Sequence, residues 1–96
     1  MPVTLTPRER SSLKGRAHAL EPVLQIGHAG LSEAVLKEAD RALTAHELIK
    51  VRVGGDDRDT RAALIDELCT KTDAAKVQTV GKIAVLWRPR PQDDEA

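Results

Sequence analysis

The 96-residue chain is 41% hydrophobic and 31% charged and has no net charge, a composition typical of one soluble globular domain. This composition excludes a disordered chain, and no apolar run is long enough to cross a bilayer. The first residues lack a basic segment followed by an apolar one, so we expect a cytoplasmic protein without a membrane partner. The only cysteine, Cys69, has no internal disulfide partner, and its helical apolar pattern predicts a buried thiol.

Charge is unevenly distributed along this neutral chain. Basic and acidic residues number four and two in 1–31, two and none in 48–53, and four and none in 75–91. In contrast, 32–47 holds two basic and four acidic residues, and 54–74 holds three and six. We therefore expect one basic face on a single domain spanning 1–91, followed by an acidic tail over 92–96.

The first predicted element is a helix over about 7–17. Thr6 is suited to the N-cap, Pro7 to the first helical position, and Glu9 completes a capping box. Helical spacing predicts an exposed side with Arg8, Lys14 and Arg16 and an inner side with Leu13, Ala17 and Leu20.

A glycine-containing loop follows the first strand. Residues 23–26 are predicted to form a buried strand, which leads through Gly27-His28-Ala29-Gly30 into a helix over about 32–46. The first turn of a helix has unpaired N–H groups and a partial positive charge, which favour a bound phosphate or carboxylate. The pattern fits such an anion site, but a glycine-rich turn between a strand and a helix is more often a plain turn.

The second half of the chain is predicted to form a strand, a helix and a β-hairpin. Residues 48–53 alternate, with Lys50 and Arg52 on one face and apolar residues on the other. Gly54-Gly55-Asp56-Asp57 then leads into a helix over about 58–71. Strands over 75–80 and 82–88 flank a Gly81-Lys82 turn. The apolar side of the helix is expected to hold Ala62, Leu64, Ile65, Leu68 and Cys69; in the last strand, Ile83, Val85 and Trp87 share one side and Lys82, Ala84, Leu86 and Arg88 the other.

This order of elements predicts a one-sided sheet. Right-handed crossovers would place the second and third helices on the same face, with the first helix over part of the other. We expect four basic side chains to project from that open face: Lys50, Arg52, Lys82 and Arg88. Such residues bind an anionic partner or simply keep the sheet soluble.

Four motifs along the chain resemble those of the YhbY family, the stand-alone bacterial form of the CRM (chloroplast RNA splicing and ribosome maturation) domain. They are LKGRAHALEP (13–22), IGHAGL (26–31), HELIKV (46–51), and VGK (80–82) with LWRP (86–89), in a match that covers about 6–91. The resemblance implies an α+β two-layer sandwich with a mixed four-stranded sheet, in which the last strand is inserted and antiparallel. This fold would be similar to the C-terminal domain of translation initiation factor three.

The resemblance also implies an RNA-binding protein associated with precursors of the large ribosomal subunit. The family's loop at this position is likened to the phosphate-gripping loop of KH domains, and basic side chains near it are taken to contact RNA. Carried over to this chain, the RNA-binding residues are Gly27, His28, Ala29, Gly30, Lys14, Arg16, Lys50, Arg52, Lys82 and Arg88. Phe and Tyr are absent and Trp87 is the only aromatic residue, so we expect recognition of phosphates and RNA shape rather than base stacking.

Two other classes of function remain open. An enzyme is disfavoured because the glycine loop lacks the Lys and Ser/Thr of a P-loop and no histidine–acid–nucleophile set appears. We accordingly expect no cofactor, no metal and a monomer. The stronger alternative is a protein-binding adaptor in ribosome assembly that uses the two acidic helices, over 32–46 and 58–71.

Overall fold

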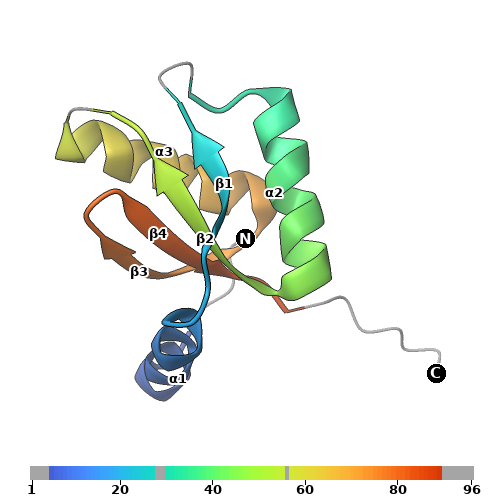
Figure 1. The fold of residues 1–96 in the computed structure, drawn as a ribbon, viewed down its shortest axis with the longest axis vertical. Helices are drawn as coiled ribbons and strands as arrows, with labels where there is room; N and C mark the ends of the chain where they lie inside the picture. Colours follow the sequence, from blue (N-terminus) through green and yellow to red (C-terminus); the bar gives the residue numbers. More distant parts are fainter. Residues whose placement is uncertain (1–4, 28–29, 56, 90–96) are drawn as a thin grey trace.

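The computed structural model describes residues 5–27, 30–55 and 57–89. Three helices and four strands follow one another in the predicted order (Figure 1). They are α1 (Pro7–Ala17), β1 (Pro22–Ile26), α2 (Glu33–His46), β2 (Leu48–Val53), α3 (Arg58–Thr72), β3 (Ala75–Val80) and β4 (Ile83–Trp87). Among the residues described, none of the helices is long and apolar enough to cross a membrane.

The helices begin where the sequence places their caps. Thr6 and Glu9 form the predicted capping box of α1, and the side chains of Ser32 and Asp57 accept hydrogen bonds at the starts of α2 and α3. At the end of α3, Asp73 adopts a left-handed conformation that reverses the chain into β3.

The four strands form one mixed sheet in the order β1-β2-β4-β3. β1 and β2 are parallel, whereas β4 is antiparallel to both of its neighbours. The two-residue turn between β3 and β4 has Gly81 at a φ of +58°, as a tight hairpin requires. The expected α+β fold with an inserted, antiparallel last strand is therefore confirmed.

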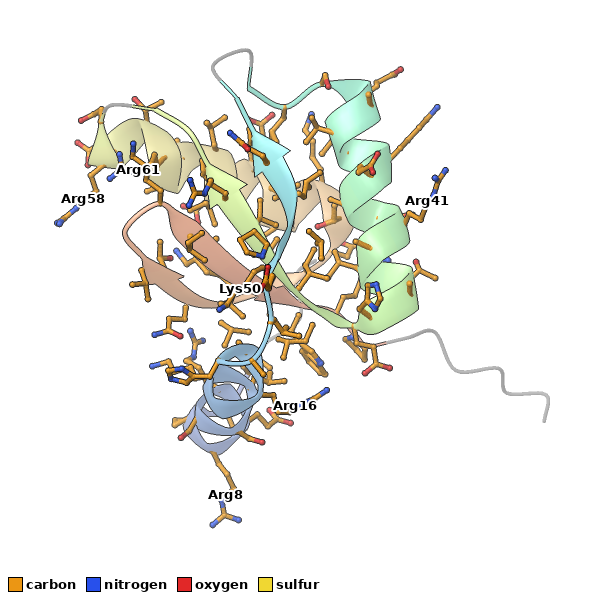
Figure 2. All side chains as sticks on the ribbon, in the orientation of Figure 1. Arg8, Arg16, Arg41, Lys50, Arg58 and Arg61 are labelled. Atoms are coloured by element: carbon orange, nitrogen blue, oxygen red, sulfur yellow. The ribbon has the colours of Figure 1, made fainter. Side chains whose placement is uncertain are left out.

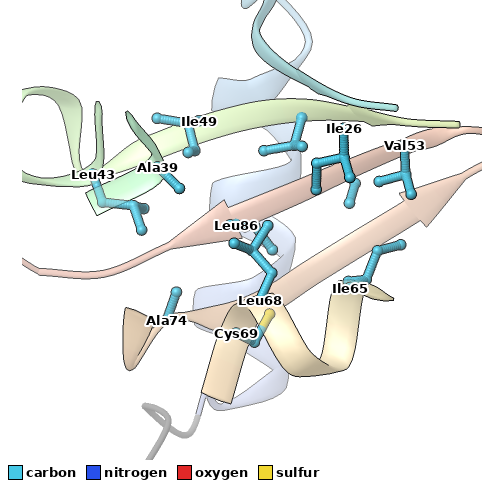
Figure 3. Close-up of a cluster of buried hydrophobic side chains, with 12 residues drawn as sticks. Ile26, Ala39, Leu43, Ile49, Val53, Ile65, Leu68, Cys69, Ala74 and Leu86 are labelled. Carbon is cyan, nitrogen blue, oxygen red and sulfur yellow. The ribbon is translucent and has the colours of Figure 1, made fainter. Parts of the chain in front are cut away.

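One face of the sheet carries the main core under α2 and α3. Twelve buried residues form it, and Ala39 and Leu43 from α2 pack together with Leu68 and Cys69 from α3 against the strands (Figure 3). β2 contributes Ile49, Val51 and Val53, the apolar positions that its alternation predicts; none of the twelve side chains is charged.

α1 covers part of the opposite face (Figure 1). Leu13 and Ala17 of α1 pack on Leu48, Ala75, Val77 and Val85, with Leu20 and the half-buried Trp87 against them. The guanidinium of Arg10 also reaches the edge strand, donating to the carbonyls of Lys76 (3.1 Å) and Val77 (3.4 Å). The expected inner side of the first helix is thus confirmed.

Three packing predictions were wrong. The first strand is not buried: β1 pairs only with β2, so it lies at the sheet edge, where Val23 is 48% exposed and Ile26 alone is buried. Ala62 of α3 is exposed because that turn of the helix extends past the core.

The two faces of β4 are also the reverse of the prediction. Residues paired in register share a face, and Lys50 pairs with Val85 while Val51 pairs with Ala84. Val85 and Trp87 therefore lie on the α1 side, and Ala84 and Leu86 are buried under α2 and α3.

Candidate functional site

A hollow of about 240 Å³ lies between α1 and the face of the sheet that α2 and α3 leave uncovered. We call it the α1 hollow. Two cationic side chains from distant parts of the chain, Lys14 of α1 and Lys50 of β2, meet there. Its lining is Lys14, Ala17, His18, Lys50, Gln78, Val80, Ile83 and Val85, with no acidic residue among them.

Local periodicity explains why these side chains converge. Lys14, Ala17 and His18 are three and four residues apart, so they share one side of α1. Lys50 alternates with buried neighbours in β2 and thus projects from the opposite, uncovered face. Ile83 and Val85 of β4 form an apolar floor beside it, because Val85 pairs with Lys50 in register.

His18 and Gln78 are site residues that the sequence-based reasoning did not nominate. Both line the α1 hollow, and His18 is exposed directly after the last turn of α1. The spacing of four between Lys14 and His18 is a signal for the histidine. Gln78 had no local signal, since its place depends on how β3 pairs with β4.

The other predicted cations do not all join this hollow. Arg52 is exposed on the same face as Lys50, two residues along β2 and paired in register with Ile83. Arg16 lies on another flank of α1, where it lines a separate hollow of about 410 Å³ with Val23 and His46. Figure 2 shows Lys50 over the sheet and Arg16 on α1.

The predicted glycine loop lies where β1 meets α2. The N–H of Gly30 donates to the carbonyl of Gly27 (3.0 Å), and Gly30 has a φ of +80°. The Ser32 hydroxyl accepts from the N–H of Val35 (3.2 Å). The N–H groups of Glu33 and Ala34 have no intrahelical acceptor, because they belong to the first turn of α2. Two nominated residues, His28 and Ala29, lie outside the described residues.

The turns that follow β1 and β2 and the turn that precedes β4 lie at one end of the sheet, which we call the glycine end. The N–H of Gly54 donates to the carbonyl of Ile26 (2.7 Å), and the N–H of Val53 donates to that of Lys82 (2.7 Å). A Cβ on Gly54 would lie 3.1 Å from the Ile26 carbonyl oxygen, so this close approach favours glycine. Lys82 is exposed at the same end of the sheet as the glycine loop, with β2 between them.

Arg88 was expected on the open face, and this placement is wrong. Its Nη1 donates to Asp40 Oδ1 (2.8 Å) and to the Thr72 carbonyl (2.8 Å). Its Nη2 donates to the Asp40 carbonyl (3.1 Å) and to Thr44 Oγ1 (2.9 Å). Because alternation in β4 turns it toward the helices, Arg88 joins α2 to the end of α3 on the face opposite Lys50.

The predicted burial of the Cys69 thiol is confirmed. Burial, with a smaller contribution from the Asp66 carboxylate, raises the pKa of Cys69 from 9.0 to about 11, against the opposing effect of Lys76. The thiol therefore stays protonated at neutral pH. In the described part of the chain, no group of three or more His, Cys, Asp or Glu side chains is arranged to hold a metal ion.

One hollow on the surface of α2 has mixed charge, although the helix as a whole is acidic. A shallow hollow on this helix is lined by Lys37, Asp40, Arg41, Thr44 and Ala45, in which two cations accompany one carboxylate. Arg41 projects from α2 away from the sheet (Figure 2). This hollow by itself carries no specific signal for a basic protein partner, and the adaptor alternative, which concerns both acidic helices, stays a prediction.

Comparison with known proteins places this fold and its loops in one family. Residues 5–88 match the model of the CRS1 / YhbY (CRM) domain. The chain is 50% identical over 86 residues to an RNA-binding protein of Haemophilus influenzae, covering 90% of this chain and 87% of the relative. It is 42% identical over 93 residues to a probable RNA-binding protein of Pseudomonas aeruginosa, covering 97% and 89%.

A solved structure agrees with this match. The solution structure of a hypothetical protein from Staphylococcus aureus has a TM-score of 0.82 and 33% identity to this chain, with 96% of each chain covered. Family, curated relatives and fold agree over nearly the whole length. The chain is a member of the CRS1 / YhbY (CRM) domain family.

Proposed function

We propose that this protein binds RNA on precursors of the large ribosomal subunit, through the α1 hollow, Arg52 and the glycine end. The observation that carries the proposal is the convergence of Lys14 and Lys50, with His18, on one hollow whose described lining residues include no acidic side chain. The curated relatives named as RNA-binding proteins and the family resemblance direct the choice of partner.

Contact with phosphates is the mode that these residues favour. The hollow joins cations to an apolar floor of Val80, Ile83 and Val85, a combination that fits a phosphate beside a ribose. Trp87, the only aromatic side chain in the sequence, is half-buried against Leu13 and Ala17 of α1 and lines a surface hollow with Arg8 and Arg16. A single partly covered ring cannot form a platform on which several bases stack. Recognition therefore rests on the RNA backbone and its shape.

The glycine loop supplies a second group of donors in this proposal. The N–H groups of Glu33 and Ala34 lie at the start of α2, and the partial positive charge of this helix end favours a bound phosphate. The carboxylate of Glu33 lies in the same turn and opposes an anion there. Glu33→Gln should therefore strengthen RNA binding.

A salt titration tests the α1 hollow. The slope of log affinity against log salt is about −0.7 per contacted phosphate for single strands, so Lys14→Gln with Lys50→Gln should make it shallower by one to two such steps. The matched control is Lys37→Gln with Arg41→Gln, which removes two charges from α2. Equal slopes for the two double variants would refute the proposed interface.

Substitution at Ala29 tests the loop. A carboxylate at this position would repel a phosphate, so Ala29→Asp should weaken RNA binding more than His28→Ala does. Thermal melting separates binding from folding, because an acidic residue near the start of α2 does not destabilise a helix. Unchanged binding by an Ala29→Asp variant that melts normally would make the loop a plain turn.

Sedimentation of cell lysates tests the ribosomal part of the proposal. At low salt the protein should migrate with large-subunit precursors rather than with translating ribosomes. Nuclease treatment should release it, since the contacts are made to RNA. Recovery only in the free-protein fractions, with precursors present, would overturn this assignment.

A further inference from the structure

A second basic hollow, of about 310 Å³, lies between α3 and β3. We call it the α3 hollow. Arg58 and Arg61 lie at the same end of α3 (Figure 2), and Lys76 of β3 stands across from that helix. The full lining is Arg58, Arg61, Ala62, Ile65, Lys76, Thr79 and Gly81.

Helical spacing builds one wall of this hollow. Arg58, Arg61 and Ala62 are three and four residues apart, and Ile65 follows at seven, so all four share one side of α3. Ile65 is 2% exposed and belongs to the core, whereas Ala62 is exposed. The wall therefore passes from an apolar base to two guanidinium groups at its rim.

A β-bulge builds the other wall. Lys76 pairs with Leu86 and Gln78 with Val85, so Val77 is an extra residue in β3. Without it, Lys76 and Thr79 would point to opposite faces, because they are an odd number of residues apart. With it, both line the α3 hollow, while Gln78 and Val80 line the α1 hollow.

The charge of the α3 hollow is positive. Among the described residues, its lining holds three cations and no acidic side chain. The Asp57 carboxylate is engaged at the helix cap with Thr60, and Asp66 pairs with Lys76 (3.3 Å). Among the ion pairs of the described residues, none includes Arg58 or Arg61.

The guanidinium groups retain donors for a ligand. The Nη1 of Arg61 donates to the Gly55 carbonyl (2.9 Å), which fixes the side chain at the rim. A guanidinium has five N–H donors in a planar fork, and a phosphate accepts two of them side by side. A held Arg61 beside an exposed Arg58 thus favours a phosphate over a single carbonyl or hydroxyl group.

We infer that the α3 hollow binds a second segment of the RNA, with a phosphate between Arg58 and Arg61 and the attached ribose over Ala62. This inference rests on the proposed function. Continuity with the glycine end favours an RNA strand as the occupant: Gly81 lines the hollow, and Leu64 of α3 lies 3.7 Å from where a Cβ of Gly30 would be. RNA leaving the glycine loop meets α3 next.

The test compares charge removal at the two hollows with single-stranded oligouridine as the probe. Arg58→Gln with Arg61→Gln should lower the affinity about tenfold and make the salt slope shallower by about 0.7, the effect of one lost phosphate contact. Lys37→Gln with Arg41→Gln is again the charge-matched control. An NMR titration of the parent should shift the amide signals of Thr79 and Gly81.

Folding is controlled by a single variant. Arg58→Gln leaves the Arg61–Gly55 hydrogen bond in place, so it should retain the parent melting temperature and still bind more weakly. If both Arg58 variants bind oligouridine as the control does while Lys14→Gln with Lys50→Gln weakens binding, the α3 hollow is overturned and the proposed function stands. If charge removal at neither hollow weakens binding, both the inference and the proposed function are refuted.

An acidic protein segment is the competing occupant. If the Arg58 and Arg61 variants lose affinity for polyglutamate but keep their affinity for oligouridine, the hollow belongs to a protein partner and the inference is wrong. Loss of oligouridine affinity together with the amide shifts at Thr79 and Gly81 supports it.

Discussion

The two faces of the sheet are built from the same strands and differ in what they hold. Under α2 and α3, twelve buried side chains include no charge, and Arg88 closes their border with bonds to both helices. Under α1, a smaller cluster of seven buried residues leaves room for Lys50 and Arg52. One face therefore supplies most of the stability, and the other is free to carry cations.

β4 shows this division within five residues. Leu86 is fully buried against the helices, whereas Ile83 is half-buried at the α1 hollow, and the two point to opposite faces. Substitutions in this one strand should accordingly separate stability from binding.

The largest effect is expected at Leu86. Leu86→Ala opens a cavity in the main core and should lower the free energy of unfolding by about 3 kcal/mol. Ile83→Ala removes a similar side chain from the α1 face and should cost about 1 kcal/mol, since that side chain is already partly in water. Urea denaturation measures both; equal losses would contradict the division between the faces.

Arg88 comes next. Arg88→Gln removes hydrogen bonds to α2 and α3 and should lower the free energy of unfolding by about 2 kcal/mol. RNA affinity measured well below the melting temperature should stay near that of the parent. Lys50→Gln should show the opposite pattern, with normal melting and weaker binding. A stable Arg88→Gln variant that loses RNA would restore Arg88 to the interface.

The dependence of stability on alkaline pH tests how well the main core shields the thiol of Cys69 from water. Folded Cys69 has a pKa of about 11, above its ordinary 9.0, so below pH 9 both folded and unfolded states hold the proton and the thiol has no effect. Above that, only the unfolded thiol ionises, and stability falls by roughly 1.4 kcal/mol per pH unit until the folded thiol also titrates. The Cys69→Ala variant should be less stable than the parent at pH 8. Its stability should fall less than that of the parent between pH 8 and pH 10, as measured by the midpoints of urea denaturation.

The smallest effect concerns the α1 layer. Thr6→Ala breaks the capping box and should cost about 1 kcal/mol. Hydrogen exchange should accelerate in α1 and remain unchanged in α2 and α3, if the α1 layer is the weaker of the two. Uniform acceleration would show that both faces unfold as one unit.

Some of this molecule follows from local sequence. Thr6 with Glu9, Ser32 and Asp57 cap the helices because their side chains bond to backbone N–H groups only three residues away. The face of Lys50 and Arg52 follows from alternation in β2, which needs no knowledge of the partner strands. The site residues Lys14 and Lys50 were for this reason within reach of prediction.

The rest depended on pairing between distant strands. Inserting β4 between β2 and β3 sets a register in which Val85 shares the face of Lys50, and this sends Arg88 to the helices. The bulge at Val77 brings Lys76 and Thr79 to one side of β3, and the α3 hollow exists only because α3 packs beside them. Local periodicity thus determined the elements and their faces in isolation, whereas tertiary packing chose the register and so decided which side chains meet.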